Sequence, residues 1–157
     1  MKKIIIIPAR LSSTRLRDKV IMDINGKTLI QRVFENAKKS KISDVYVATD
    51  SLKIKEICNS FTKNIIITSD KHKTGTDRIA EASKKIDSDI ILNIQSDEPF
   101  ISVETINNMI DLFKDPNVYM TSSMHKLSNK KEFDDPNQVK VAVDSDNYAQ
   151  LFTRFPD

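Results

Sequence analysis

The sequence predicts an α/β fold: a mostly parallel sheet with helices on both faces and a β-hairpin at the carboxyl end. Short apolar segments of strand length alternate with amphipathic segments of helical period along most of the chain. The first apolar segment, residues 3–8, is continuous, as expected for a strand covered on both faces. From residue 138 the pattern changes to a period of two around Ser145-Asp146-Asn147, which indicates a hairpin.

The strands are predicted from runs rich in isoleucine and valine, and the helices from apolar residues spaced three and four apart. Residues 28–40, for example, place Leu29, Val33 and Ala37 on one face of a helix. Residues 126–135 are predicted as a solvated loop. In chain order the predicted strands and helices are strand 3–8, helix 28–40, strand 45–49, helix 53–61, strand 64–68, helix 76–86, strand 89–94, helix 103–113, strand 118–123 and the hairpin 138–154.

Composition limits the class of protein. The 157 residues suit one domain, and 25 basic against 22 acidic residues give a net charge of +3, too balanced to indicate a nucleic-acid partner. The lone Cys58 excludes an internal disulfide. No apolar run approaches the roughly 20 residues that cross a bilayer, and the run after Met1 stops at Pro8, too early for a signal peptide. We therefore expect a cytoplasmic protein without membrane or nucleic-acid partners.

A basic stretch follows the first strand. Its cations are accompanied by the hydroxyl residues 12–14, and guanidinium groups bind phosphate oxygens in pairs, so the stretch suits a polyphosphate. The alternative is a solvated basic loop. Phosphate loops built from backbone amides need glycines, and the chain has only Gly26 and Gly75. The cations are Arg10, Arg15, Arg17 and Lys19.

The segment 72–78, HKTGTDR, opens the third predicted helix. Thr74 and Asp77 fit a capping box, which by itself explains their position. A helix amino terminus also binds anions. Arg78 opposes the helix dipole there, so its presence indicates a ligand or an acidic neighbour.

A third polar segment, NIQSDEPF at 93–100, ends a predicted strand. Asp97 and Glu98 there suit a magnesium ion shared with phosphate oxygens, because the carboxyl ends of parallel strands meet at one edge of the sheet. The alternative is a salt bridge or a cap for the next helix.

Six ordered motifs resemble one family, the 3-deoxy-manno-octulosonate (Kdo) cytidylyltransferases, also called CMP-Kdo synthetases. The resemblance covers essentially the whole chain. The segment Ser13-Thr14-Arg15-Leu16 favours this family over the sialic acid cytidylyltransferases. The motifs are PARLSSTRL (8–16) with Lys19, DINGK (23–27), VATD (47–50), TGTDRIAEA (74–82), NIQSDEPFI (93–101) and NQVKVAVD (137–144).

The resemblance implies a Rossmann-like nucleotidyltransferase that uses magnesium to join CMP from CTP to an acidic eight-carbon sugar of lipopolysaccharide. It implies catalytic roles for Arg10, Lys19 and Asp97, with Asp97 as the metal ligand. It further implies that Gly75 allows close backbone approach and that the other nucleotide-binding residues help to seat CTP. The nucleotide-binding residues implied are Arg10, Ser13, Arg15, Lys19, Gly75, Arg78 and Gln95.

The chain also departs from the family pattern. Arg17-Asp18 replaces a proline–glycine pair, and Ser96 replaces a glycine whose position could demand positive φ. The family continues into a segment that supplies sugar contacts, a second metal-binding aspartate and much of a homodimer interface, so residues 1–157 are expected to be one nucleotide-binding domain lacking that segment. The alternatives are a non-catalytic CTP-binding remnant and a cytidylyltransferase for another acidic sugar.

Overall fold

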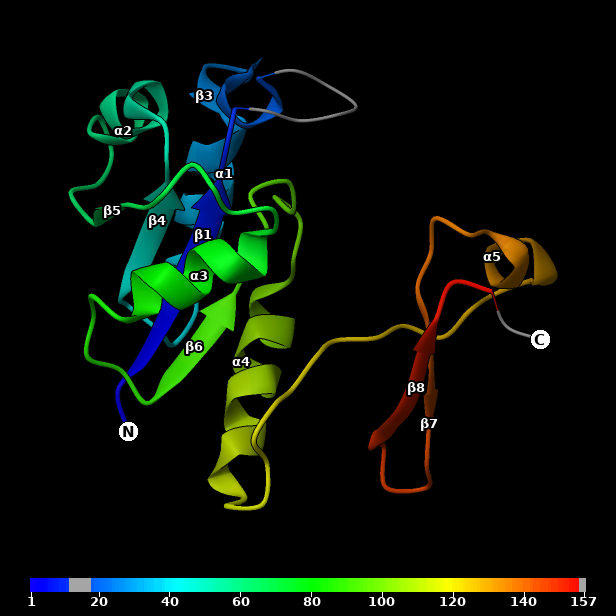
Figure 1. The fold of residues 1–157 in the computed structure, drawn as a ribbon. Coiled ribbons are helices and arrows are strands. Elements are labelled where there is room, and N and C mark those ends of the chain that lie inside the picture. Colours follow the sequence, from blue (N-terminus) through cyan, green and yellow to red (C-terminus); the bar gives the residue numbers. More distant parts are fainter. Residues whose placement is uncertain (12–17, 156–157) are drawn as a thin grey trace. The chain divides into compact units, whose positions relative to one another are not determined.

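The computed structural model describes residues 1–11 and 18–155. Its backbone divides into two units, residues 1–119 and residues 120–157 (Figure 1). Each unit has its own sheet or hairpin.

The first unit is built on a four-stranded parallel sheet in the order β5-β4-β1-β6. Its strands are β1 (Lys3–Ala9), β4 (Val45–Thr49), β5 (Ile65–Ile67) and β6 (Ile90–Asn93). The four isoleucines at 4–7 are fully buried, because helices cover both faces of the central strand. The predicted parallel sheet is confirmed.

The helices divide between the two faces according to the alternation of side chains along β1. Ile5 and Ile7 pack with α1, α2 and α4, whereas Ile4 and Ile6 pack with α3, which crosses the sheet face turned toward the viewer in Figure 1. The predicted placement of helices on both faces is therefore confirmed. The helices are α1 (Leu29–Ala37), α2 (Leu52–Cys58), α3 (Gly75–Ser83) and α4 (Val103–Asp111), with 3-10 turns η1 (Lys19–Ile21) and η2 (Leu112–Lys114).

The four helices begin at side-chain caps and end earlier than the apolar pattern predicts. Thr28, Ser51, Thr74 and Ser102 each accept a hydrogen bond from the backbone N–H three residues on. After α1, α2 and α3, backbone bonds of the three-residue type continue for one turn, so apolar residues keep their spacing where the α-helix has already ended. In the described ranges no helix is both long and apolar enough to cross a membrane.

A small hairpin accounts for the DINGK motif. β2 (Asp23–Ile24) and β3 (Lys27–Thr28) pair antiparallel around Asn25 and Gly26, whose φ values are 51° and 79°. Two successive positive φ values define the type I′ turn that Asn-Gly favours. This hairpin is not among the elements predicted from the sequence, although the Asn-Gly pair signals it.

The second unit contains the predicted carboxyl-terminal hairpin, which is confirmed: β7 (Lys140–Val143) pairs antiparallel with β8 (Ala149–Thr153). Lys140 is buried, and its ammonium group donates to the carbonyl oxygens of Asp135 (2.6 Å), Gln138 (3.1 Å) and Arg154 (2.9 Å). These three bonds use all three donors of the lysine and tie the two ends of the hairpin together.

Two predictions near this unit are wrong. Residues 118–123, all within the described part of the chain, form no strand, because a strand needs a paired neighbour and no sheet ladder includes them. Tyr119 and Met120 there are exposed. The predicted loop 126–135 contains helix α5 (Lys130–Asp134). Asn129 caps it by accepting from the Glu132 N–H at 3.0 Å, a signal that the sequence carried.

Candidate functional site

A cavity of about 200 Å³ lies at the carboxyl end of β1, beside β6. The sheet order reverses at β1, since β4 and β6 flank it on opposite sides. The chain runs from β1 to β4 on one side, and it reaches β6 on the other side through α3, which packs on the sheet face opposite α1. Ligands of open α/β sheets usually lie at the carboxyl ends of the strands at such a switch point. All six described residues among the predicted site residues line the cavity: Arg10, Lys19, Gly75, Arg78, Gln95 and Asp97.

The cavity is smaller than the roughly 300–1,000 Å³ typical of ligand sites. The described residues therefore account for part of the surface that a nucleoside triphosphate would contact. Ser13 and Arg15, the other two predicted nucleotide-binding residues, lie outside the described residues. The remaining lining residues are Pro8, Ala9, Val20, Thr74 and Ser96.

An ion pair between Lys19 and Asp97 crosses the cavity, with Nζ and Oδ2 3.0 Å apart. Lys19 begins η1 and Asp97 lies in the turn after β6, so the pair joins the two predicted loops. Both side chains are partly exposed, at 39% and 50%. A pair so open to water contributes at most about 1 kcal/mol to stability, and a ligand can therefore separate the two groups at low cost.

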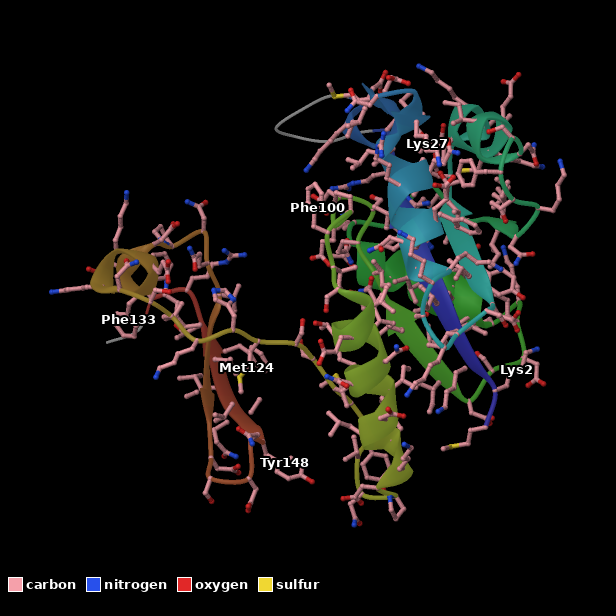
Figure 2. All side chains as sticks on the ribbon, turned by 180° about the vertical axis from the view of Figure 1, so that it is seen from behind. Lys2, Lys27, Phe100, Met124, Phe133 and Tyr148 are labelled. Atoms are coloured by element: carbon pink, nitrogen blue, oxygen red, sulfur yellow. The ribbon has the colours of Figure 1, made fainter. Side chains whose placement is uncertain are left out.

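Glu98 differs from its neighbour Asp97. Loss of hydration, and secondarily the Asp97 charge, raise the pKa of Glu98 above its usual value. Glu98 does not line the cavity. Asp97 is thus the carboxylate that faces the cavity. Phe100, beyond the turn, is 94% exposed (Figure 2).

Arg78 is buried, and its guanidinium binds three protein groups. Its Nη2 lies 2.8 Å from Oδ2 of Asp50, and its Nη1 donates to the Thr68 hydroxyl at 2.5 Å and, at 3.5 Å, to the Ser69 carbonyl. The acidic neighbour that the sequence required for this cation is therefore Asp50, the last residue of the VATD motif. Asp50 and Thr68 are not among the predicted site residues, although both directly follow strands, as site residues do.

The start of α3 forms another wall of the cavity. Thr74 and Asp77 form the predicted capping box. A Cβ on Gly75 would lie 3.2 Å from Pro8 Cγ and 3.3 Å from Gln95 Oε1, so the absence of a side chain lets the helix start pack against both neighbouring strand ends. The close backbone approach expected at Gly75 is therefore made here to side-chain atoms of Pro8 and Gln95.

Arg10 and Gln95 complete the described part of the site. Arg10 Nη1 donates to the Lys73 carbonyl oxygen at 3.4 Å, and Gln95 Nε2 donates to Asn93 Oδ1 at 2.8 Å. Arg10 thus links the end of β1 to the segment before α3.

The two departures from the family pattern have different backbone outcomes. Asp18 adopts φ 58°, the left-handed region that favours glycine, and its carboxylate lies 3.5 Å from Lys53 Nζ on α2. Ser96 is not among the described residues with positive φ, so a serine there is unstrained.

The donor set fits a metal ion only in part. Among the residues that the structure describes, no three histidine, cysteine, aspartate or glutamate side chains are grouped to hold one. Among the described residues that line the cavity, Asp97 is the one with a carboxylate. A magnesium ion commonly takes one or two carboxylates and completes its shell with substrate phosphates and water. The site therefore fits a metal that arrives with a polyphosphate.

Comparison with known proteins shows which family the chain resembles. The Cytidylyltransferase family profile matches residues 4–156. The 3-deoxy-manno-octulosonate cytidylyltransferase of Francisella tularensis subsp. novicida (strain U112) is 46% identical over 154 residues, 96% of this chain and 62% of that protein. The protein of the same description from Fusobacterium nucleatum subsp. nucleatum is 46% identical over 156 residues, 98% of this chain and 64% of that protein.

Solved structures show the same relationship. A CMP:2-keto-3-deoxy-manno-octonic acid synthetase complexed with CTP superposes with a TM-score of 0.89 at 32% identity, covering 99% of this chain and 65% of that chain. A cytidylyltransferase from Leptospira borgpetersenii gives 0.66 at 30% identity, covering 74% and 50%. The predicted fold class and the resemblance to CMP-Kdo synthetases are confirmed. The chain spans about 62% of the length of the first Francisella relative, and it belongs to the cytidylyltransferase family.

Proposed function

We propose that the chain is a cytidylyltransferase that activates 3-deoxy-manno-octulosonate with CTP. The anomeric hydroxyl oxygen of the sugar attacks the α-phosphorus of CTP and loses its proton. The bond from that phosphorus to the bridging oxygen breaks, and CMP-Kdo and pyrophosphate result. Such a product serves lipopolysaccharide synthesis, and the dependence on CTP argues for a cytoplasmic reaction.

The observation that carries this proposal is the convergence of Arg10, Lys19, Gly75, Arg78, Gln95 and Asp97 on one cavity at the switch point of the sheet. They come from three separate polar stretches of the sequence, each of which follows a strand. Two relatives whose names state this activity are 46% identical to the chain. A solved structure bound to CTP has the same fold.

The chain's own residues contribute positioning and charge to this reaction. Lys19 leaves Asp97 and neutralises phosphate oxygens, and Arg10 supplies a second cation at the same strand end. Gln95 and the start of α3 around Gly75 seat the nucleotide. The buried guanidinium of Arg78 holds Asp50 and Thr68 and thereby fixes the helix start, so it acts on the nucleotide through the wall of the cavity.

Asp97 is the residue that would hold a magnesium ion. When bound, the ion would neutralise charge on the phosphates of CTP. The described donor set makes the ion depend on the nucleotide for its remaining ligands, and we therefore expect metal and CTP to bind together. The homodimer implied by the resemblance belongs to the same proposal.

Calorimetric titration with CTP and magnesium tests the nucleotide site. We expect binding to this chain, tighter for CTP than for ATP, with a raised melting temperature; at a hundredfold excess of ligand over its dissociation constant the stabilisation is about 2.7 kcal/mol. No heat and no thermal shift at millimolar CTP would exclude the nucleotide site. Equal affinity for ATP would mean that the site binds the triphosphate without recognising the base.

Pyrophosphate release separates the remaining alternatives. Kdo-dependent release from CTP supports the full reaction. CTP binding without release under any acidic sugar supports a binding remnant, and release with a different acidic sugar only supports another cytidylyltransferase.

A further inference from the structure

Glu81, on α3, holds the segment that precedes its own helix. Its Oε2 accepts from the Ser69 backbone N–H at 2.8 Å and lies 2.6 Å from Nε2 of His72. Its Oε1 accepts from Lys85 Nζ at 3.0 Å. A carboxylate can only accept hydrogen bonds, so the His72 ring nitrogen is the donor in that contact. Glu81 thus binds the segment 69–72 at two points.

The carboxylate is ionised in this arrangement. The hydrogen bond from Ser69, followed by those from His72 and Lys85, lowers the pKa of Glu81 to about 2. Hydrogen bonds to an ionised acceptor are roughly twice as strong as bonds between neutral groups. The side chain is 28% exposed and that of His72 22%, so water competes with the contact only in part.

The bound segment leads directly into the cavity wall. One residue after His72, the Lys73 carbonyl accepts from Arg10, and Thr74 and Gly75 line the cavity. At its other end, Thr68 and Ser69 accept from Arg78. Two α3 side chains of opposite charge, Arg78 and Glu81, therefore fix the segment between β5 and α3.

We propose that Glu81 is a positioning residue for the nucleotide site: by holding Ser69 and His72 it sets where the Lys73 carbonyl, Thr74 and Gly75 lie. Glu81 does not line the cavity, so it acts through this segment and not on the ligand. The proposal rests on the proposed function, because it names a residue that the CTP site requires.

The test compares magnesium–CTP affinity with ligand-free melting temperature in a set of variants. Glu81→Ala removes the contacts with both Ser69 and His72 and should weaken affinity about tenfold, the scale of one lost charge-assisted bond. Glu81→Gln keeps an oxygen for the Ser69 N–H, so its affinity should lie between those of the wild type and Glu81→Ala. His72→Gln keeps a donor and should bind better than His72→Ala.

Two controls separate positioning from general destabilisation. Lys85→Ala removes the third contact of Glu81, together with the bond from Lys85 Nζ to the Ile67 carbonyl oxygen at 2.7 Å, and should leave affinity within twofold of the wild type. Ile79→Val loosens the packing of α3 beneath the sheet and should lower the melting temperature without changing affinity. If Glu81→Ala does not fold, the order of the two His72 variants decides.

The outcomes are distinct. The positioning role is supported if the Glu81 and His72 variants lose more CTP affinity than Ile79→Val does. The comparison is made between variants whose melting temperatures fall by the same amount. Two results would overturn this inference and leave the CTP site intact, provided that the wild type binds CTP. One is an unchanged affinity in Glu81→Ala. The other is an equal affinity in His72→Gln and His72→Ala. Absence of CTP binding by the wild type overturns the proposed function and this inference together.

Discussion

Arg78 lines the cavity and was expected to bind a ligand, yet its guanidinium contacts Asp50 and Thr68. Its guanidinium is 2% exposed and pairs with Asp50, whose side chain is 20% exposed. Removing one partner of such a pair leaves a poorly hydrated charge behind, which is the costly case for ion pairs. The residue is therefore predicted to matter first for folding and only then for the nucleotide.

Replacing Arg78 by Met should lower the free energy of unfolding by about 3 kcal/mol, the lower end for a broken buried pair because Asp50 retains some water. The matched control is Lys41→Met, which breaks the exposed pair with Asp111 and should cost less than about 1 kcal/mol. Urea denaturation measures both. Equal losses would contradict the burial argument.

Asp97 and Glu98 are adjacent but should behave differently. Asp97→Asn should abolish the enhancement of CTP binding by magnesium, because Asp97 is the carboxylate that faces the cavity. Glu98→Gln should largely preserve it. Calorimetry with and without magnesium gives the comparison, and equal losses would mean that the two residues act as one general acidic patch.

At the scale of elements, the capped start of α3 serves both stability and the site. Thr74→Ala removes the hydroxyl that accepts from the Asp77 N–H at 3.1 Å and should cost about 1 kcal/mol. Ser102→Ala removes the equivalent cap of α4, with a 2.9 Å bond, at a similar cost. Only the first cap lines the cavity, so only Thr74→Ala should weaken CTP binding; a similar loss in Ser102→Ala would refute this.

The contacts of Glu81 with the segment 69–72 should make the free energy of unfolding depend on pH in the acid range. Because the folded pKa of about 2 lies below the ordinary 4.5, the ionised carboxylate stabilises the fold above pH 4.5, and this contribution disappears as the pH falls from 4.5 toward 2. The difference in unfolding free energy between wild type and Glu81→Gln should be largest above pH 4.5 and shrink as the pH falls from 4.5 toward 2. Urea titrations at stepped pH measure it, and a constant difference would disprove the assignment.

Elements with their own apolar pattern could be predicted from the sequence. The four parallel strands and four long helices were expected because burial on a sheet face imposes the period that the sequence carries. Strand 118–123 was predicted wrongly for the same reason: Tyr119 and Met120 suit a strand, but pattern alone supplies no partner for the backbone. Pairing is a property of the fold.

The candidate site was predictable where side chains follow strands and obscure where partners come from afar. Lys19 and Asp97 were expected on facing loops, and they lie 3.0 Å apart. The Arg78–Asp50 pair joins residues 28 positions apart, and the contact of Glu81 with Ser69 depends on how the intervening segment folds back. No local pattern in the sequence encodes these two contacts.

On the scale of the whole molecule, the β7–β8 hairpin presents large apolar side chains to solvent: Leu151 is 57% exposed and Phe152 58%. A two-stranded sheet is marginal by itself, and exposed strands with apolar side chains favour association. We expect sedimentation velocity to show association that increases with protein concentration.

The single-domain organisation expected for residues 1–157 stays a prediction.

The same experiment on two variants tests the surface. Leu151→Lys should reduce association, because it removes apolar area and adds charge. Gln150→Lys adds the same charge on the same strand without removing apolar area, and should reduce association less. A monomeric wild type, or equal effects of the two variants, would contradict an apolar interface on this hairpin.

The Lys19–Asp97 pair has one more consequence. Without ligand, each charge is the counterion of the other, so lysine competes with any metal for the carboxylate, and the aspartate competes with any phosphate for the ammonium group. One substitution should therefore have effects of opposite sign. Lys19→Met should bind free magnesium more tightly than the wild type, since Asp97 loses its competitor, and should bind triphosphate more weakly, since the cation is gone.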